Sequence, residues 1–135
     1  MALRYLLDTN ICIYIAKERP PSVAKRFAKL EVGTVGMSLI TFGELRYGAE
    51  KSASSTRALD ALEQLIGLIP VIEPTAAVGA TYGVLRAHLE RLGTPIGSND
   101  LWIAAHAQTL GMTLVTNNTR EFERVPKLKV QNWVE

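Results

Sequence analysis

The sequence has few of the residues that carry disulfides or soft-metal sites. Its 135 residues include one cysteine and two histidines. A single thiol cannot form an internal disulfide, and no Cys or His spacing resembles a zinc site. Cys12 lies in an apolar run, so we interpret it as a small buried hydrophobic residue and not as a nucleophile.

Long apolar runs and a strong excess of one charge are also absent. No stretch approaches the ~20 apolar residues of a membrane span, and no secretory signal is visible, so we expect a cytoplasmic protein without a membrane partner. Fifteen Lys and Arg against 13 Asp and Glu give a net charge of +2. This argues against binding by bulk charge alone, but it permits a nucleic-acid partner if cations gather beside one site.

What the chain does have is a regular alternation of short apolar segments and longer helical patterns. Strands are predicted at 4–7, 33–37, 69–72, 113–116 and 129–131, and helices at 10–17, 21–30, 41–50, 57–68, 75–92 and 100–110. This order is typical of βαβ units. The predicted fold class is therefore α/β, with a central, mainly parallel sheet flanked by helices on both faces. No linker, repeat or low-complexity segment interrupts it, so we expect one domain over residues 1–135.

Three carboxylates lie where a site could form. Asp8 directly follows the first predicted strand, and ligands gather beyond the carboxyl ends of strands in open α/β sheets. Glu44 lies on the helix after the second strand, and Asp100 opens an almost wholly apolar helix that must be largely buried. Taken singly, each could be a helix-terminus charge or a solvated residue. Together they favour a site for a divalent cation with oxygen ligands.

The segment after the strand at 113–116 adds polar groups at the same edge of the sheet. Thr116, Asn117 and Asn118 could orient water or a ligand, and a turn explains the asparagines equally well. The two histidines, His88 and His106, lie in helical patterns away from the acidic residues, so we interpret both as structural or surface residues.

Four segments then occur in a characteristic order: LLDTN at 6–10, SLITFGELRYG at 38–48, PIGSNDLWIAA at 95–105 and LVTNNTREF at 114–122. Together they resemble the motifs of PIN-domain ribonucleases, in the form typical of VapC toxins from bacterial VapBC toxin–antitoxin pairs. The resemblance implies a PIN-like α/β fold, an acidic pocket that holds Mg²⁺ or Mn²⁺, and cleavage of RNA.

The resemblance also implies roles for six residues: Asp8, Glu44 and Asp100 as metal-binding carboxylates, with Thr9, Thr116 and Asn118 as further catalytic residues. Asn118 stands in a motif where many PIN domains have an aspartate, and an amide adds no negative charge. This weakens the case for a tightly held second metal. Glu121 is the alternative acid of that motif.

The implied protein is a toxin: a Mg²⁺-dependent endoribonuclease, with Mn²⁺ as the alternative ion, that hydrolyses phosphodiester bonds of RNA, with transfer RNA as the expected substrate. We expect a homodimer that is neutralised by a VapB-type antitoxin. The antitoxin tail would place a guanidinium among the carboxylates and apolar anchors against Ile15, Phe27 and Tyr47. Candidate contacts to RNA phosphates are Arg46, Lys51, Arg86, Arg120 and Arg124.

Two other classes of function share parts of this pattern. Phosphatases with an acidic Mg²⁺ pocket need Asp-x-Asp after the first strand, but here Asn10 replaces the second acid, and the adjacent acids of a receiver domain are missing. A non-catalytic RNA-binding domain would have lost carboxylates from the pocket, yet three remain in place.

Overall fold

The computed structural model describes residues 2–135; Met1 lies outside the described residues. Five strands form one sheet in the order β3-β2-β1-β4-β5, and all four neighbouring pairs are parallel. The strands are β1 (Tyr5–Leu7), β2 (Val35–Ser38), β3 (Val71–Ile72), β4 (Thr113–Val115) and β5 (Val130–Gln131). The predicted α/β class with a parallel sheet is confirmed. The strand order reverses between β1 and β4, which makes their carboxyl ends the topological switch point of the sheet.

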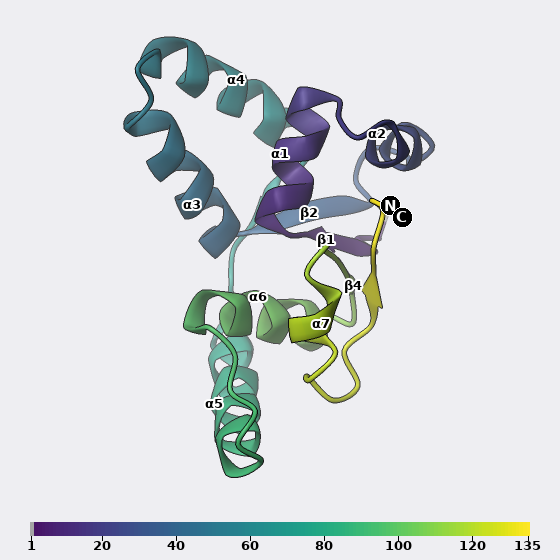
Figure 1. Cartoon of the computed structure of the whole chain (residues 1–135), viewed down its shortest axis with the longest axis vertical. Helices are drawn as coiled ribbons and strands as arrows, with labels where there is room; N and C mark the ends of the chain where they lie inside the picture. The colour runs from purple at the N-terminus through teal and green to yellow at the C-terminus, as the bar shows by residue number, and fades with distance from the viewer. Residues whose placement is uncertain (1) are drawn as a thin grey trace.

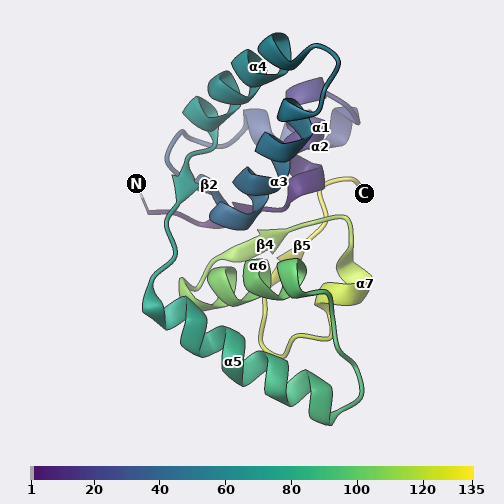
Figure 2. The same cartoon turned by 90° about the vertical axis from the view of Figure 1, so that its left-hand side faces the viewer.

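Helices cover both faces of this sheet (Figures 1 and 2). One layer contains α1 (Thr9–Lys17), α2 (Pro21–Ala28), α3 (Leu39–Glu50) and α4 (Ser55–Leu68), and the other contains α5 (Ala76–Arg91), α6 (Ser98–Thr109) and α7 (Thr119–Phe122). Among residues 2–135, the structure contains no helix that is both long and apolar enough to span a membrane.

Side-chain alternation along the strands divides the core between the two faces. Leu6 packs with apolar residues of α5 and α6, whereas its neighbour Leu7 packs with residues of α1, α2 and α4. Both leucines are fully buried, as a strand covered on both faces requires. The predicted burial of α6 is confirmed, because its residues from Ile103 to Ala105 are completely enclosed.

The boundaries of several elements differ from the predictions for local reasons. Helix α1 begins one residue earlier than predicted, because an Asp8 oxygen accepts a 2.8 Å hydrogen bond from the Thr9 amide and caps the helix. The segment Thr119–Phe122, for which no helix was predicted, forms the short helix α7. Its Phe122 is fully buried in the core, and this tertiary contact outweighs the turn preference of the preceding asparagines.

One predicted surface residue is buried. Ile15 was expected to anchor a partner, but it is 7% exposed and packs in the core, so that expectation is wrong. Ile15 follows Ile11 by four residues and therefore lies on the same face of α1, which contacts the sheet. Of the other two expected anchors, Phe27 is half-buried and Tyr47 is 65% exposed. Cys12 is fully buried, as predicted, and burial raises the pKa of its thiol.

The packing of β2 against β3 leaves no room beside Gly36. A Cβ atom at this position would lie 2.8 Å from Cγ1 of Ile72 and 3.3 Å from the Pro70 carbonyl oxygen. We therefore expect Gly36→Ala to lower the free energy of unfolding by about 1–3 kcal/mol, because the added methyl group overpacks the site. Urea titration followed by circular dichroism measures this change.

Gly83→Ala is the matched control, because a Cβ atom at this position on α5 has no neighbour within 4 Å. It should raise stability by about 0.5–1 kcal/mol, the usual gain for alanine over glycine inside a helix. Adding Ile72→Val to Gly36→Ala should restore part of the loss. Equal stabilities of the two alanine variants would contradict the packing described for β2 and β3.

Candidate active site

The switch point of the sheet is occupied by the carboxylate of Asp8, which is 7% exposed. One of its oxygens accepts the cap hydrogen bond from Thr9, and the other accepts a 2.8 Å hydrogen bond from the Thr116 hydroxyl at the end of β4. The same Thr116 oxygen accepts a 3.0 Å hydrogen bond from the backbone amide of Asn118. The carboxylate is therefore a helix cap and, at the same time, a fixed group at the edge where ligands bind.

Glu44 is brought to this edge by α3. Its Oε1 accepts a 2.8 Å hydrogen bond from the hydroxyl of Thr9, so the residue after Asp8 positions the second carboxylate. The Thr9 hydroxyl also lies 3.3 Å from that of Thr41, a buried residue whose amide donates to the Ser38 hydroxyl at 3.0 Å. Ser38 and Thr41 belong to the second sequence motif, but their part in positioning the Thr9 hydroxyl was not predicted from the sequence.

Asp100 reaches the site from the first turn of α6 and meets Glu121 of α7. The two side chains share a hydrogen bond. Glu121 also accepts hydrogen bonds from the Gly97 amide at 3.0 Å and from Asn118 Nδ2 at 2.8 Å. Within the fourth motif, the structure thus places the Glu121 carboxylate beside Asp100 and the Asn118 side chain against Glu121, and the role of each stays a prediction.

The four carboxylates of Asp8, Glu44, Asp100 and Glu121, here called the acidic site, influence one another's ionisation. Burial raises the pKa of Asp8, against the hydrogen bonds from Thr116 and Thr9, and the negative charges of Glu44 and Glu121 raise it further. Burial is also the largest cause that raises the pKa of Asp100 to about 7, followed by its hydrogen bond to Glu121 and the surrounding charges. Near neutral pH, Asp100 therefore carries a proton for much of the time.

Glu121 shows the opposite behaviour. Burial alone would raise its pKa, but the hydrogen bonds from Gly97, Asn118 and Asp100, together with the charge of Arg124, lower it below the ordinary value for glutamate. The proton of this pair therefore resides on Asp100, and the carboxylate of Glu121 carries the charge.

The donor set of the acidic site suits a hard divalent cation. It consists of carboxylate oxygens supported by hydroxyl groups, and no imidazole or thiol contributes. Within residues 2–135, no three Asp, Glu, His or Cys side chains converge as a preformed metal site. The raised pKa of Asp100 is relevant to cation binding, because a bound cation would displace the proton of Asp100 and supply positive charge among the carboxylates in its place.

The arginines that were candidates for RNA contact are engaged in different interactions. Arg46 and Arg86 form ion pairs with the glutamates four residues later, at 2.7 and 3.1 Å. Arg124 donates to the Pro95 carbonyl at 3.0 Å and is close enough to lower the pKa of Glu121.

His106 is 2% exposed within the core, and burial lowers its pKa, which agrees with the structural role predicted for it.

The comparisons with known proteins identify the class to which this fold and site belong. Residues 5–128 match the family model of the PIN domain. The chain is 46% identical over 131 residues to the tRNA(fMet)-specific endonuclease VapC of Shigella flexneri, covering 97% of this chain and 98% of that protein. It is 43% identical over 132 residues to ribonuclease VapC2 of Haemophilus influenzae, covering 98% and 99%. The chain therefore belongs to the PIN-domain family and, within it, to the VapC ribonucleases.

Solved structures agree with this assignment. VapBC-1 from nontypeable Haemophilus influenzae aligns with a TM-score of 0.91 and 40% identity, covering 98% of this chain and 100% of the other. The DNA-bound VapBC from Salmonella typhimurium aligns with a TM-score of 0.91 and 41% identity, covering 97% and 98%. The predicted fold and family are thus confirmed, whereas the roles of individual site residues stay predictions.

Asp100→Asn should remove a pH dependence of stability. The Asp100 carboxyl has a pKa of about 7 in the folded protein and an ordinary value of 3.8. Between these values the folded state binds more protons, so this contribution to stability is largest below the lower value and is lost as the pH rises through the higher one. Asparagine stays neutral. In EDTA, the melting temperature of the variant relative to the native protein should therefore increase from about pH 5 to about pH 8.

Asp60→Asn, at an exposed position on α4, is the control for this measurement and should show no such trend. A difference in melting temperature between Asp100→Asn and the native protein that is constant across the pH series would show that Asp100 does not hold a proton near neutral pH.

Proposed function

We propose that this chain is the toxin of a type II toxin–antitoxin pair, acting as a Mg²⁺-dependent endoribonuclease on transfer RNA. The observation that carries the proposal is that Asp8, Glu44, Asp100 and Glu121 lie close enough, at the carboxyl edge of a VapC-family sheet, to shift the pKa values of Asp8 and Asp100. The relative from Shigella flexneri is named for its action on tRNA(fMet), and its similarity extends over 97% of this chain. We further propose that residues 1–135 form one PIN domain.

Asp8, Glu44 and Asp100 are the residues proposed to hold the cation, which we take to be Mg²⁺ with Mn²⁺ as the alternative. When bound, such an ion supplies an activated water molecule and positive charge for the scissile phosphate. Thr116 and Thr9 have a separate task. Their hydroxyls fix the carboxylates of Asp8 and Glu44, so that neither must be ordered when RNA arrives.

The pair of Asp100 and Glu121 controls the charge of the acidic site. While Asp100 keeps its proton, repulsion among the four carboxylates is reduced and the site is stable without an ion. Loss of that proton completes the anionic site. Asn118 is proposed as a positioning residue, because its amide holds Glu121 at 2.8 Å and touches no other carboxylate among residues 2–135.

Glu44→Gln should abolish RNA cleavage while the protein stays folded. The amide keeps the size of the side chain but lacks the charge that a hard cation requires. We expect a loss of at least about 100-fold in kcat/KM, the order of effect for removal of a group acting on the transition state. The native enzyme should release 5′-phosphate and 3′-hydroxyl ends and should lose activity in EDTA, as end mapping by sequencing and gel assays would show.

Glu63→Gln is the matched control, since Glu63 carries the same charge and is exposed on α4. It should retain full activity. Cleavage by Glu44→Gln at the native rate, or cyclic 2′,3′-phosphate ends that persist in EDTA, would exclude the proposed chemistry.

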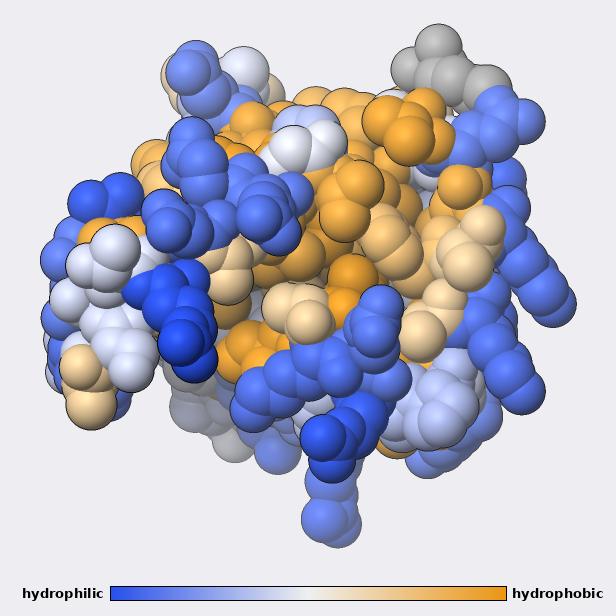
Figure 3. Space-filling view, turned by 90° about the horizontal axis from the view of Figure 1, so that it is seen from above, coloured by the Kyte–Doolittle hydropathy of each residue, from blue (hydrophilic) through white to orange (hydrophobic). Residues whose placement is uncertain are grey.

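A groove in the upper helical layer, here called the apolar groove, supports the proposed antitoxin. It lies among α1, α3 and α4 and has a volume of about 510 Å³. Its walls include Ile13, Leu45, Ala61 and Leu65, and Thr9 and Glu44 also line it. Figure 3 views the molecule from the side of this layer and shows apolar side chains gathered across it. Apolar walls that lead to carboxylates fit a peptide with hydrophobic anchors and a guanidinium.

VapBC complexes are among the similar solved structures, which makes a VapB-type antitoxin the proposed occupant of the groove. The homodimer is also retained as a proposal. Exposed apolar side chains elsewhere, such as Leu39 at 48% and Val84 at 70% exposure, offer surface for it outside the groove.

Ala61→Asp should prevent neutralisation without preventing cleavage. Ala61 lines the groove on α4, and a carboxylate there would be buried against the apolar anchors of the antitoxin. After co-expression with the protein encoded beside this gene, pull-down should recover the native complex but not the variant complex. Gln64→Asp, an exposed position of the same helix outside the groove, should bind normally. Equal recovery of both variants would exclude the apolar groove as the docking site.

A further inference from the structure

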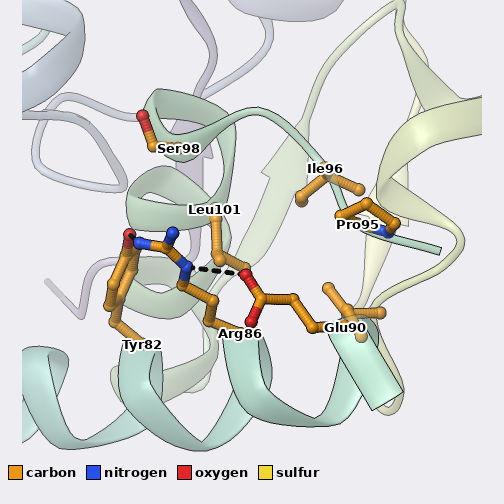
Figure 4. Close-up of a pocket in the computed structure, with 8 residues that line it drawn as sticks. Tyr82, Arg86, Glu90, Pro95, Ile96, Ser98 and Leu101 are labelled. Atoms are coloured by element: carbon orange, nitrogen blue, oxygen red, sulfur yellow. Dashed lines mark hydrogen bonds and ion pairs between the residues drawn. The ribbon is translucent and has the colours of Figure 1, made fainter. Parts of the chain in front are cut away.

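A smaller cavity, here called the α5–α6 pocket, lies between the C-terminal half of α5 and the first turn of α6 (Figure 4). Its volume is about 190 Å³, and its lining includes Tyr82, Arg86, Glu90, Ile96, Ser98 and Leu101. Asp100 of the acidic site lies on the same helical turn as Ser98 and Leu101 of this pocket. Gly97 directly precedes this turn, and its backbone amide donates a hydrogen bond to Glu121 of the acidic site.

The side chain of Arg86, which is 55% exposed, makes two hydrogen bonds beside this pocket. Its Nε donates to Glu90 at 3.1 Å and its Nη1 donates to the Tyr82 hydroxyl at 3.0 Å. The Tyr82 ring is itself stacked on Trp102, with ring centroids 3.8 Å apart and planes 11° apart. Nη2 has no hydrogen-bond partner within the described part of the chain. Figure 4 shows the guanidinium between Tyr82 and Leu101, facing the first turn of α6.

The charges around Arg86 disfavour a phosphate as its ligand. The carboxylate of Glu90 lines the same pocket and would repel a second anion. The remaining walls include Ile96 and Leu101, which favour a flat, neutral and partly apolar group. A nucleobase meets this description. Among base edges, the O6 and N7 atoms of guanine present two adjacent acceptors, and an arginine fork is the most common specific partner of that edge.

We propose that the α5–α6 pocket binds a guanine base of the RNA substrate next to the cleavage site, with the Arg86 fork donating to O6 and N7. This inference rests on the proposed endoribonuclease function. Glu90 and Tyr82 are positioning residues that aim the fork. Single-stranded bases of RNA are splayed out and read along such edges, so one guanine near the scissile bond would be selected by this pocket.

The test is an interference experiment with 7-deazaguanine, which lacks the N7 acceptor. A transfer-RNA transcript is prepared with this analogue incorporated at random, cleaved, and the modified positions in cut and uncut molecules are compared. For the native protein we expect one guanine near the cleavage site at which the analogue lowers kcat/KM by roughly 5- to 100-fold, the loss of one base contact. For Arg86→Gln this position should become insensitive, with KM raised more than kcat is lowered.

Arg91→Gln is the matched control, because Arg91 lies on the same helix, carries the same charge and does not line the pocket. It should keep the interference pattern of the native protein. Tyr82→Phe preserves the ring that stacks on Trp102 but loses the hydrogen bond to Arg86, so the same guanine should lose part of its effect. Thermal melting should show that all three variants are folded.

The outcomes separate this inference from the function on which it rests. If the native protein cuts no RNA, the endoribonuclease proposal fails and the guanine subsite fails with it. If the native protein cuts RNA but no guanine shows interference that depends on Arg86, only the guanine subsite is wrong. A fall of about 0.7 in the slope of log binding constant against log salt for Arg86→Gln would identify a phosphate contact and overturn base recognition.

Discussion

The burial of negative charge at the carboxyl end of β1 is the constraint on which the rest of this structure depends. Asp8 is nearly inaccessible and has other carboxylates close by, an arrangement that is unfavourable unless hydrogen bonds or a cation compensate it. The negative charge is stabilised by two hydrogen bonds, one from the Thr9 amide at the start of α1 and one from the Thr116 hydroxyl just after β4. Because these donors come from elements far apart in sequence, the charge of the site is coupled to the correct assembly of the sheet.

The parts of the structure that the sequence predicted are those governed by local chemistry. The alternation of apolar segments and helices predicted the parallel sheet, and the position of Asp8 after a strand predicted its place at the carboxyl edge of the sheet. The role of Glu121 was uncertain because a motif alone does not fix the alignment of a variable segment to within one residue. In the structure, burial of Phe122 in the core sets which side chains of α7 face the site. Ile15 was assigned to the surface because the period of α1 alone does not say which face meets the sheet.

The pocket beside Arg86 could not be predicted, since it is made by the crossing of two helices and not by any motif. Sequence spacing shows that Arg86 and Glu90 can pair on one helix face, as Arg46 and Glu50 do. What distinguishes the pair on α5 is the turn of α6 above it and the stacked ring of Tyr82 beside it. The two ion pairs have the same spacing in the sequence, and only tertiary packing gives the pair on α5 a pocket beside it.

Residues of the acidic site, or their neighbours on the same helical turn, belong to two cavities of different character, and this constrains the proposed inhibition. Thr9 and Glu44 line the apolar groove, whereas Ser98 and Leu101, on the same helical turn as Asp100, line the α5–α6 pocket. A partner that fills the groove reaches the carboxylates from the side of α3 and need not enter the pocket beside Arg86. Under the proposed function, such a partner would inhibit by neutralising the carboxylates proposed to hold the cation, with apolar contacts in the groove adding to its affinity. A guanine bound at Arg86 would not by itself displace it, so the partner and the substrate compete at the carboxylates.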